Sequence, residues 1–231
     1  LKETEAIVLD DHIAGYMAFN VNINTGGTVI DVGANIGVFG VRLLQKNPHI
    51  HIHCFEPIPD IYKVLKKNSA LYSNKYFHTY MMGLSNTNKE LNFTYYPNSP
   101  ALSTAQPEIW DLDESNLNSA VKGNILAMQS QFWWTKLIPT FLIPIIIKYL
   151  KSNKKEIKSQ VITLSHFIEQ NNISIIDLLK IDCEGEEINV LHGIKEKHWE
   201  LINTIIMEVN DVKNNLNTAK NILTKNGFTN I

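Results

Sequence analysis

Apolar positions in the first third of the chain alternate between short runs and stretches with helical spacing. Residues 28–32 ("TVIDV") and 50–55 ("IHIHCF") are runs of strand length, and a third lies near 77–82. Residues 36–47 and 60–72 place apolar side chains at intervals of three and four, as amphipathic helices do. This alternation predicts βαβ units and a mostly parallel sheet with helices on both faces.

The same alternation returns near the end of the chain. Residues 174–182 and 204–209 are predicted strands, and residues 184–193 and 214–225 are predicted helices. We therefore expect residues 1–231 to form a single α/β domain. Sheets of this class bind ligands outside the carboxyl ends of their strands, so polar residues that follow strands are the candidate site residues.

The alternation breaks between about 105 and 160, where "FWWTKLIPTFLIPIIIKYL" (132–150) is strongly apolar. Its uncharged core, residues 137–147, is 11 residues long and too short to span a bilayer. We expect an inserted helical cap over the strand ends, with the lysines that follow it on a solvated flank. A lid over an apolar substrate and attachment to a membrane surface are the alternatives.

Composition restricts the classes of partner. The 231 residues carry a formal net charge of −2, which argues against a nucleic-acid partner. Arg42 is the only arginine, so a phosphate clamp built from several arginines is excluded. With two cysteines and no signal peptide ahead of the first strand, we expect a cytoplasmic protein. The chain begins with Leu1, and we expect it to be a domain excised from a longer protein.

The segment "VIDVGANIGVFG" (29–40) is a predicted strand, a glycine turn and a helix start. Gly33 and Gly37 allow a tight turn and the close approach of a ligand. Asn35 occupies the middle position of the dinucleotide fingerprint, where a glycine makes room for a pyrophosphate, and this argues against a diphosphate. Asp31 could accept a hydrogen bond from an ammonium group or a water molecule.

Glu56 ends the second predicted strand, 25 residues after Asp31. A carboxylate at that position can accept hydrogen bonds from both hydroxyls of a ribose. A loop suited to an amino-acid group and an acid suited to a ribose together favour S-adenosylmethionine as the cofactor.

Four segments resemble the successive motifs of FkbM-family methyltransferases: "VIDVGANIGVFG", "CFEPIPDIYKVLKKN" (54–68), "LSNTNKELNFTYYPNSPALST" (84–104) and "LLKIDCEGEEINVLHG" (178–193). The resemblance implies a seven-stranded class I, Rossmann-like fold and S-adenosylmethionine-dependent O-methyltransferase activity. We expect the cofactor to be bound by residues that the resemblance implies or that follow predicted strands. These residues are Asp31, Gly33, Ala34, Asn35, Gly37, Glu56, Pro57, Gly83, Leu84 and Asp182.

The stretch "YYPNSPALST" is similar to FkbM-type domains within polyketide and nonribosomal peptide synthases, which methylate hydroxyls on carrier-bound intermediates. The implied substrate is a hydroxyl of a small molecule or of a carrier-tethered intermediate, with neighbouring megasynthase domains as partners. A sugar or glycan hydroxyl, and a cofactor-binding module without turnover, remain alternatives. The missing middle glycine argues against a third alternative, a nicotinamide-dependent oxidoreductase.

The segment "KIDCEGEE" (180–187) concentrates acids at the end of an apolar strand. Transfer of a methyl group to an aliphatic hydroxyl needs a group that removes the hydroxyl proton. Asp182 is the first candidate for this base or for orienting the acceptor, and Glu184 is the second, either for positioning the hydroxyl or for capping the next helix. Glu186 and Glu187 suit the solvated first turn of that helix, where its dipole favours acids.

Lys180 shares a strand face with Asp182, and we expect it to pair with Glu208 at the end of the neighbouring strand. A catalytic lysine is the alternative. The oxygens of Asp182, Glu208 and Asn210 could instead bind magnesium, as in metal-dependent catechol O-methyltransferases.

The histidines and cysteines receive mainly structural interpretations. His12 precedes the first strand in a segment that could fold over the pocket, so a base role is an alternative for it. His49, His51 and His53 share a strand face without the further ligands of a zinc site. His192 is expected at a helix end, and Cys54 and Cys183 are expected to be packing residues.

Overall fold

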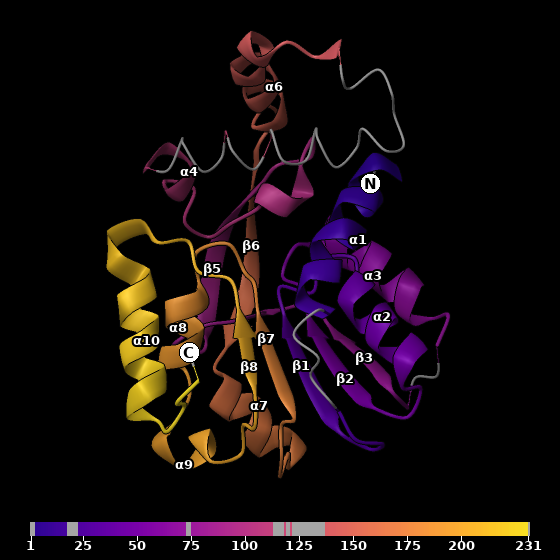
Figure 1. Ribbon diagram of the computed structural model, residues 1–231, viewed down its shortest axis with the longest axis vertical. Coiled ribbons are helices and arrows are strands. Elements are labelled where there is room, and N and C mark those ends of the chain that lie inside the picture. Colours follow the sequence, from indigo (N-terminus) through magenta and orange to yellow (C-terminus); the bar gives the residue numbers. More distant parts are fainter. Residues whose placement is uncertain are drawn as a thin grey trace.

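The computed structural model describes residues 3–17, 23–72, 75–112, 118, 121 and 137–230. Its main sheet has five parallel strands in the order β3-β2-β1-β7-β8 (Figure 1). The strands are β1 (Thr28–Val32), β2 (His51–Phe55), β3 (Phe77–Tyr80), β7 (Leu178–Ile181) and β8 (Ile205–Met207). The predicted α/β, Rossmann-like class is confirmed, but the main sheet of the described residues has five strands and not the seven that the resemblance implies.

Helices cover both faces of this sheet because alternate strand residues point to opposite sides. Val29 and Leu178 pack toward one face, which carries α1 (Glu3–Met17), α2 (Val38–Lys46) and α3 (Pro59–Ser69). Ile30 and Leu179 pack toward the other. That face carries α7 (Leu164–Asn171), α8 (Glu187–His192) and α10 (Asn215–Lys225), with the short α9 (Glu196–Trp199) nearby.

The chain order reverses beside β1, which has β2 on one side and β7 on the other. The loops that follow β1 and β7 therefore meet at the topological switch point, where open α/β sheets bind ligands. The Asp182 amide donates to the Val32 carbonyl at 3.1 Å, and the Gly33 amide donates to the Phe55 carbonyl at 3.1 Å. The first bond ties the start of the loop after β7 to the end of β1, and the second ties the loop after β1 to the end of β2.

A second sheet has the order β4-β6-β5, from β4 (Gly83–Leu84), β6 (Lys155–Ile162) and β5 (Lys89–Tyr95). The predicted helical insert of about 105–160 is therefore too long, because residues 155–160 belong to β6 and pair antiparallel with β5. The lysines there occupy exposed strand positions at 155 and 158, while Ser159 and Val161 are buried. Because these lysines face solvent, the sequence of β6 resembles a solvated, lysine-rich flank.

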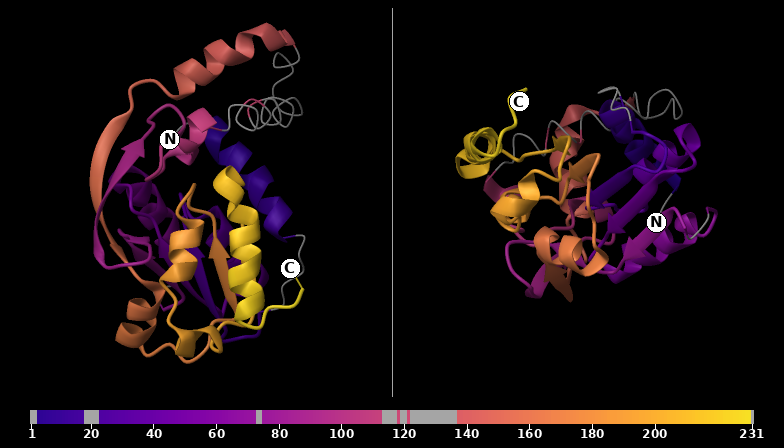
Figure 2. Two further views of the ribbon diagram at one scale, coloured as in Figure 1. Left: turned by 90° about the vertical axis from the view of Figure 1, so that its left-hand side faces the viewer. Right: turned by 90° about the horizontal axis from the view of Figure 1, so that it is seen from below.

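The insert contributes η1 (Pro100–Leu102), α4 (Ile109–Leu112), η4 (Thr140–Leu142) and α6 (Ile143–Leu150). Figures 1 and 2 show α6 standing away from the main sheet, at the far end of β6. Ile143 packs in a cluster with Tyr96, Ile109 and Trp110. Residues 132–136 of the apolar segment lie outside the described residues. Within the described ranges, no helix is both long and apolar enough to cross a membrane.

Two predicted boundaries near the site differ from the structure in ways that affect the site. The strand predicted at 174–182 is hydrogen-bonded as a strand only from Leu178 to Ile181. The helix predicted at 184–193 begins at Glu187, because Glu184 (φ 54°) and Gly185 (φ 108°) take left-handed conformations that a helix cannot include. The acid-rich segment is therefore a loop at the switch point. The helix α1, which the weak amphipathic pattern of residues 3–17 did not predict, packs against α2.

Candidate active site

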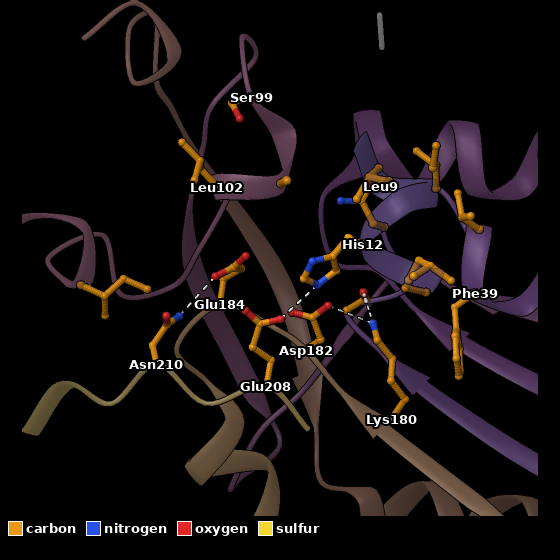
Figure 3. Close-up of a pocket in the computed structure, with 18 of the residues that line it drawn as sticks. Leu9, His12, Phe39, Ser99, Leu102, Lys180, Asp182, Glu184, Glu208 and Asn210 are labelled. Atoms are coloured by element: carbon orange, nitrogen blue, oxygen red, sulfur yellow. Dashed lines mark hydrogen bonds and ion pairs between the residues drawn. The ribbon is translucent and has the colours of Figure 1, made fainter. Parts of the chain in front are cut away.

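A cavity of about 500 Å³ opens at the carboxyl ends of β1, β7 and β8 (Figure 3). Helix α1 contributes Leu9, His12 and Ile13 to its wall, and the cap contributes apolar side chains such as Trp110 and Leu150. Its polar side is formed by residues that follow strands: Asn35, Asp182, Glu184, Glu208 and Asn210. The cavity is thus apolar over most of its wall and acidic at the strand ends.

Lys180 lies in the wall of the cavity with its side chain only 2 % exposed. Its ammonium contacts Asp31 at 3.1 Å and Asp182 at 3.3 Å, and it donates to the Gly33 carbonyl at 3.2 Å. The predicted pairing with Glu208 is wrong, because the register of β1 and β7 places Asp31 directly beside Lys180. Burial alone would lower the pKa of Lys180, but the two carboxylates more than reverse this and raise it.

Asp31 is fully buried and ion-paired with Lys180, so it lies behind the cavity wall and does not offer its carboxylate to an ammonium of a ligand. Burial raises the pKa of Asp31, and the Lys180 charge opposes this. Cys54 occupies the neighbouring position on β2 and is buried there as a packing residue. Cys183 packs against the core on the other side of the sheet.

Tyr16 joins the two acids that face the cavity. Its hydroxyl donates to Glu208 at 2.7 Å and lies 3.2 Å from the Asp182 carboxylate. Burial raises the pKa of Tyr16, and the Asp182 and Glu208 charges raise it further, so the phenol keeps its proton as a donor. Tyr16 was not among the predicted site residues, although its spacing of four residues from His12 would place both on one side of a helix.

His12 lies 3.1 Å from Glu208 through Nε2. The hydrogen bond with Glu208 raises the pKa of His12, and the Asp182 charge adds to this against the effects of burial and Lys180. The same bond lowers the pKa of Glu208, which therefore stays ionised. The alternative in which His12 folds over the pocket matches its observed position.

Glu184 points into the cavity from the left-handed position that precedes Gly185 (Figure 3). Burial raises the pKa of Glu184 well above its usual range, and the nearby Asp182, Glu187 and Glu208 charges add to the effect. Asn210 donates its side-chain amide to this carboxyl at 3.3 Å. Glu184 makes no capping bond to α8, so the capping alternative is wrong.

The assignment of Glu186 and Glu187 to a solvated helix face is also wrong, since they are 6 % and 2 % exposed. Glu187 accepts from the amides of Cys183 and Gly185, at 3.2 and 2.9 Å. Glu186 accepts from Ser85 at 3.0 Å and Gln106 at 2.9 Å. Both carboxylates therefore brace the loop that carries Asp182 and Glu184.

The segment after β5 holds the same loop from above. The Thr104 hydroxyl donates to the Glu184 carbonyl, and the Gln106 side-chain amide donates to the Gly185 carbonyl at 2.8 Å. This explains part of the "YYPNSPALST" motif structurally, because Thr104 is its last residue. Thr104 and Gln106 were not among the predicted site residues.

The glycines of the loop after β1 allow close packing of the backbone, and Gly33 also lines both hollows. A Cβ at Gly33 would lie 1.8 Å from the Asp182 carbonyl oxygen, and one at Gly37 would lie 2.6 Å from a Leu65 methyl group. Both have positive φ, of 75° and 84°. Gly33, Ala34 and Asn35 line the cavity, whereas Gly37 lies behind them against α3.

Glu56 sits at the bottom of a smaller hollow of about 60 Å³, which is also lined by Pro57, Gly83 and Leu84. It accepts from the Asn35 amide at 3.1 Å and from the Ile58 amide at 2.9 Å. Burial raises the pKa of Glu56 to about 7, although these two amides oppose the shift. The smaller hollow and the main cavity share lining residues, among them Gly33, Asn35 and Asp182.

The magnesium set is not assembled as predicted, because Asn210 contacts Glu184 and not the Asp182–Glu208 pair. The metal-ligand atoms of His12, Asp182 and Glu208 do lie within 4.8 Å of one another. Their contacts are the hydrogen bonds described above, which centre on Glu208 and Tyr16.

His51 and His53 stack on His78, and His53 bonds to the Tyr80 hydroxyl at 2.9 Å. His192 ends α8, as predicted.

Comparison with known proteins gives the family. Residues 31–229 match the Methyltransferase FkbM domain. The chain belongs to the FkbM methyltransferase family. No solved structure matches it significantly.

Three relatives of this FkbM domain illustrate the range of the family. It is 30 % identical over 201 residues to "Methyltransferase 1" of Beauveria bassiana, covering 87 % of this chain and 71 % of the relative. It is 28 % identical over 214 residues to the 31-O-demethyl-FK506 methyltransferase FkbM of Streptomyces tacrolimicus, covering 93 % and 77 %. It is 25 % identical over 236 residues to the AMB antimetabolite synthetase AmbE of Pseudomonas aeruginosa, covering 99 % of this chain and 11 % of that protein.

Proposed function

We propose that this FkbM domain is an S-adenosylmethionine-dependent O-methyltransferase. One observation carries the proposal: the hollow around Glu56 and the large cavity beside Asp182 share the wall formed by Gly33 and Asn35. A ligand with a ribose at Glu56 and a charged end near Asp182 would extend from one hollow into the other. The family membership supports the same class of reaction.

The residues present fit this cofactor. The side-chain oxygen of Asn35 is buried without a hydrogen-bond partner among the described residues, so it can accept from a ligand. Glu56 uses one lone pair on each oxygen for backbone amides and retains others for two ribose hydroxyls. Asp182 and Glu208 give the cavity a negative character that suits a sulfonium cation. The hollow around Glu56 is smaller than a nucleoside, so η1, which lines it, would shift on binding.

The lining of the cavity supports a proposal for the second substrate. Bound S-adenosylmethionine would supply an electrophilic methyl group, and the acceptor hydroxyl must reach it in line. The acids at the strand ends can accept the hydrogen of that hydroxyl, while Ile13, Leu102 and Trp110 exclude water. This mixture favours an apolar molecule with one hydroxyl group.

We propose a hydroxyacyl chain, free or tethered to a carrier protein, as the acceptor. The chain spans 11 % of the synthetase AmbE, in which an FkbM-like segment is part of a much longer protein, and this supports a role beside other synthase domains. The relative named for 31-O-demethyl-FK506 supports transfer to oxygen. On this proposal the domain acts in the cytoplasm.

The direct test is calorimetric titration of the FkbM domain with S-adenosylhomocysteine. We expect micromolar binding to the wild type and at least tenfold weaker binding to Glu56→Ala, since loss of the ribose acceptor costs about 1.4 kcal/mol or more. Glu90→Ala, a surface change on β5, is the matched control and should bind as the wild type does. A wild-type protein without affinity for S-adenosylhomocysteine would contradict the proposal.

A further inference from the structure

We infer that His12 of α1 is the general base that removes the proton from the acceptor hydroxyl, and that Glu208 positions it. This inference rests on the proposed O-methyltransferase function. It concerns a residue that lies outside the part of the chain that matches the family, residues 31–229. The base would thus be supplied by a helix that precedes the matched domain.

The geometry around His12 is that of a histidine held by a carboxylate. Its Nε2 lies 3.1 Å from Glu208 and 3.1 Å from the Tyr16 hydroxyl. The charge of Glu208 is maintained by the His12 contact and by the Tyr16 hydroxyl at 2.7 Å. When Nε2 carries the hydrogen and donates it to Glu208, Nδ1 keeps a lone pair. Among the described residues none hydrogen-bonds to Nδ1. The ring lines the main cavity (Figure 3), so this nitrogen is available to an acceptor.

Asp182, the first candidate from the sequence, is less available for this task. Its Oδ2 lies 3.3 Å from the Lys180 ammonium, which donates to it, and 3.2 Å from the Tyr16 hydroxyl, whose single hydrogen is shared with Glu208. Lys180 is buried and cannot move away without leaving Asp31 unpaired. Asp182 is therefore suited to orienting the acceptor and the cofactor, whereas His12 is half exposed and can pass a proton to water.

Proton removal by His12 and methyl transfer from the cofactor form one step. The acceptor O–H bond breaks and its proton moves to Nδ1 of His12, while the acceptor oxygen forms a bond to the methyl carbon of the sulfonium cofactor. The electron pair of the C–S bond goes to sulfur, which leaves a methyl ether and a thioether. The imidazolium formed at His12 is stabilised by Glu208 and loses its proton to solvent before the next turnover.

The charged and titratable groups facing His12 determine how the step depends on pH. Glu208 and Asp182 favour the protonated ring, Lys180 opposes it, and Tyr16 remains a neutral donor. The pKa of His12 is raised, so the neutral ring needed for catalysis becomes more abundant as the pH rises through that value. The rate should therefore increase with pH above the ordinary histidine range and then level off.

The first test is independent of the acceptor. In ¹⁵N NMR of the full domain saturated with S-adenosylhomocysteine, with the His12 signal assigned by its loss in His12→Gln, the neutral ring should be the Nε2–H tautomer. Its pKa should lie above 6.5 and should fall in Glu208→Gln. A neutral ring in the Nδ1–H form, or a pKa unaffected by Glu208→Gln, would overturn the inference.

The second test uses S-adenosylmethionine and the N-acetylcysteamine thioester of 3-hydroxyoctanoate as the acceptor. His12→Gln should bind S-adenosylhomocysteine as the wild type does but transfer methyl 10²–10⁴-fold more slowly, and without the wild-type pH dependence. Imidazole should restore part of the rate of His12→Ala. His192→Gln, an exposed histidine at the end of α8, should behave as the wild type does.

The results of these tests distinguish a failure of the His12 inference from a failure of the proposed function. A His12→Gln protein with the full rate would remove His12 from the mechanism and leave the O-methyltransferase proposal intact. Loss of activity in EDTA that magnesium restores would replace the base by a metal ion. A wild-type protein that does not bind S-adenosylhomocysteine would instead contradict the proposed function itself, while the tautomer of His12 in the ligand-free protein would still test the His12–Glu208 pair.

Discussion

The side chain of Lys180 joins three parts of the domain at one buried point. It contacts a carboxylate on β1, a carboxylate that faces the cavity, and the carbonyl of the loop between them. A buried cation with these partners holds Asp182 in place, and without it two acids would face each other in an apolar setting. Lys180 therefore holds Asp182 in position at the edge of the cavity that both residues line.

Replacement of Lys180 by methionine should destabilise the domain by about 3–5 kcal/mol, because it leaves two carboxylates buried without their cation. Urea unfolding at pH 7.5 would measure the change. Lys195→Met removes a surface lysine that pairs with Glu169 and should leave the midpoint nearly unchanged. If both variants unfold at the same urea concentration, the buried triad does not stabilise the fold as described.

Glu184 shows that backbone conformation and charge are linked at this site. Its φ of 54° is unfavourable for a residue with a Cβ and places its carboxyl in the cavity. The loop tolerates this conformation because Glu187, Thr104 and Gln106 bond to its backbone. The four acids of this segment thus have two roles. Asp182 and Glu184 face the cavity, whereas Glu186 and Glu187 brace the loop.

At the scale of elements, the contact between the β1 and β7 loops depends on Gly33. Gly33→Ala should destabilise the domain by about 3 kcal/mol or more, because the new methyl group would overlap the Asp182 carbonyl oxygen at a positive φ. Gly26→Ala is the matched control, with a similar φ of 83° but open space around its Cβ, and should cost only about 1–2 kcal/mol. Thermal unfolding of the two variants measures the difference.

A smaller effect in Gly33→Ala than in Gly26→Ala would show that the two loops are not in contact in solution. Because both glycines flank β1, the difference between the two variants reports on the contact between the β1 and β7 loops.

The helix α1 is held to the rest of the domain through polar contacts as well as Ile13. Arg42 of α2 contacts Asp10 with two hydrogen bonds, of 2.8 and 2.5 Å, and Tyr16 reaches the strand ends. This helix completes the cavity wall, so its docking and the proposed chemistry are linked.

Tyr16→Phe should weaken the docking of α1 by about 1–3 kcal/mol, since Asp182 and Glu208 lose a shared donor. Amide hydrogen exchange of residues 8–17 should become faster, while exchange in β1 stays slow. Tyr62→Phe removes a longer, neutral bond to Thr79, of 3.4 Å, and should cost at most about 1 kcal/mol. Unchanged exchange in α1 of Tyr16→Phe would mean that the apolar contacts alone dock the helix.

At the scale of the whole molecule, the buried acids make stability depend on pH. Burial raises the pKa values of Asp31, Glu56, Glu184 and Glu187 in the folded state. A carboxyl group with a raised folded pKa binds its proton more tightly when folded, so stability is lost as the pH rises through that pKa. These four acids therefore stabilise the ligand-free domain more near pH 5 than near pH 8, whereas the lowered pKa values of His53, His78 and His198 act in the opposite direction.

Glu56 should account for a measurable share of this change. Its folded pKa of about 7, against 4.5 for the free side chain, corresponds to on the order of 3 kcal/mol lost between pH 4.5 and 8. Glu56→Gln keeps the shape without the titration, so its stability should fall less over the same range in urea unfolding. Identical pH profiles for the two proteins would contradict the raised pKa of Glu56.

The sequence alone determined the class of the domain and the identity of most residues near the site. Alternation of strand and helix patterns gave the five parallel strands, and the acids that follow them, such as Glu56, Asp182 and Glu208, do line the two hollows. Short-range periodicity can do this because it reports which side of a local element is buried, and because parallel strands end at the same edge of a sheet.

Only the tertiary structure decided which of these groups are partners. Strand order and register paired Lys180 with Asp31, the packing of α1 brought His12 and Tyr16 to the acids, and the segment after β5 buried Glu186. These contacts join residues up to 196 positions apart. No local pattern encodes them, because they follow from how whole elements pack, and the free energy of that packing is spread over the entire core.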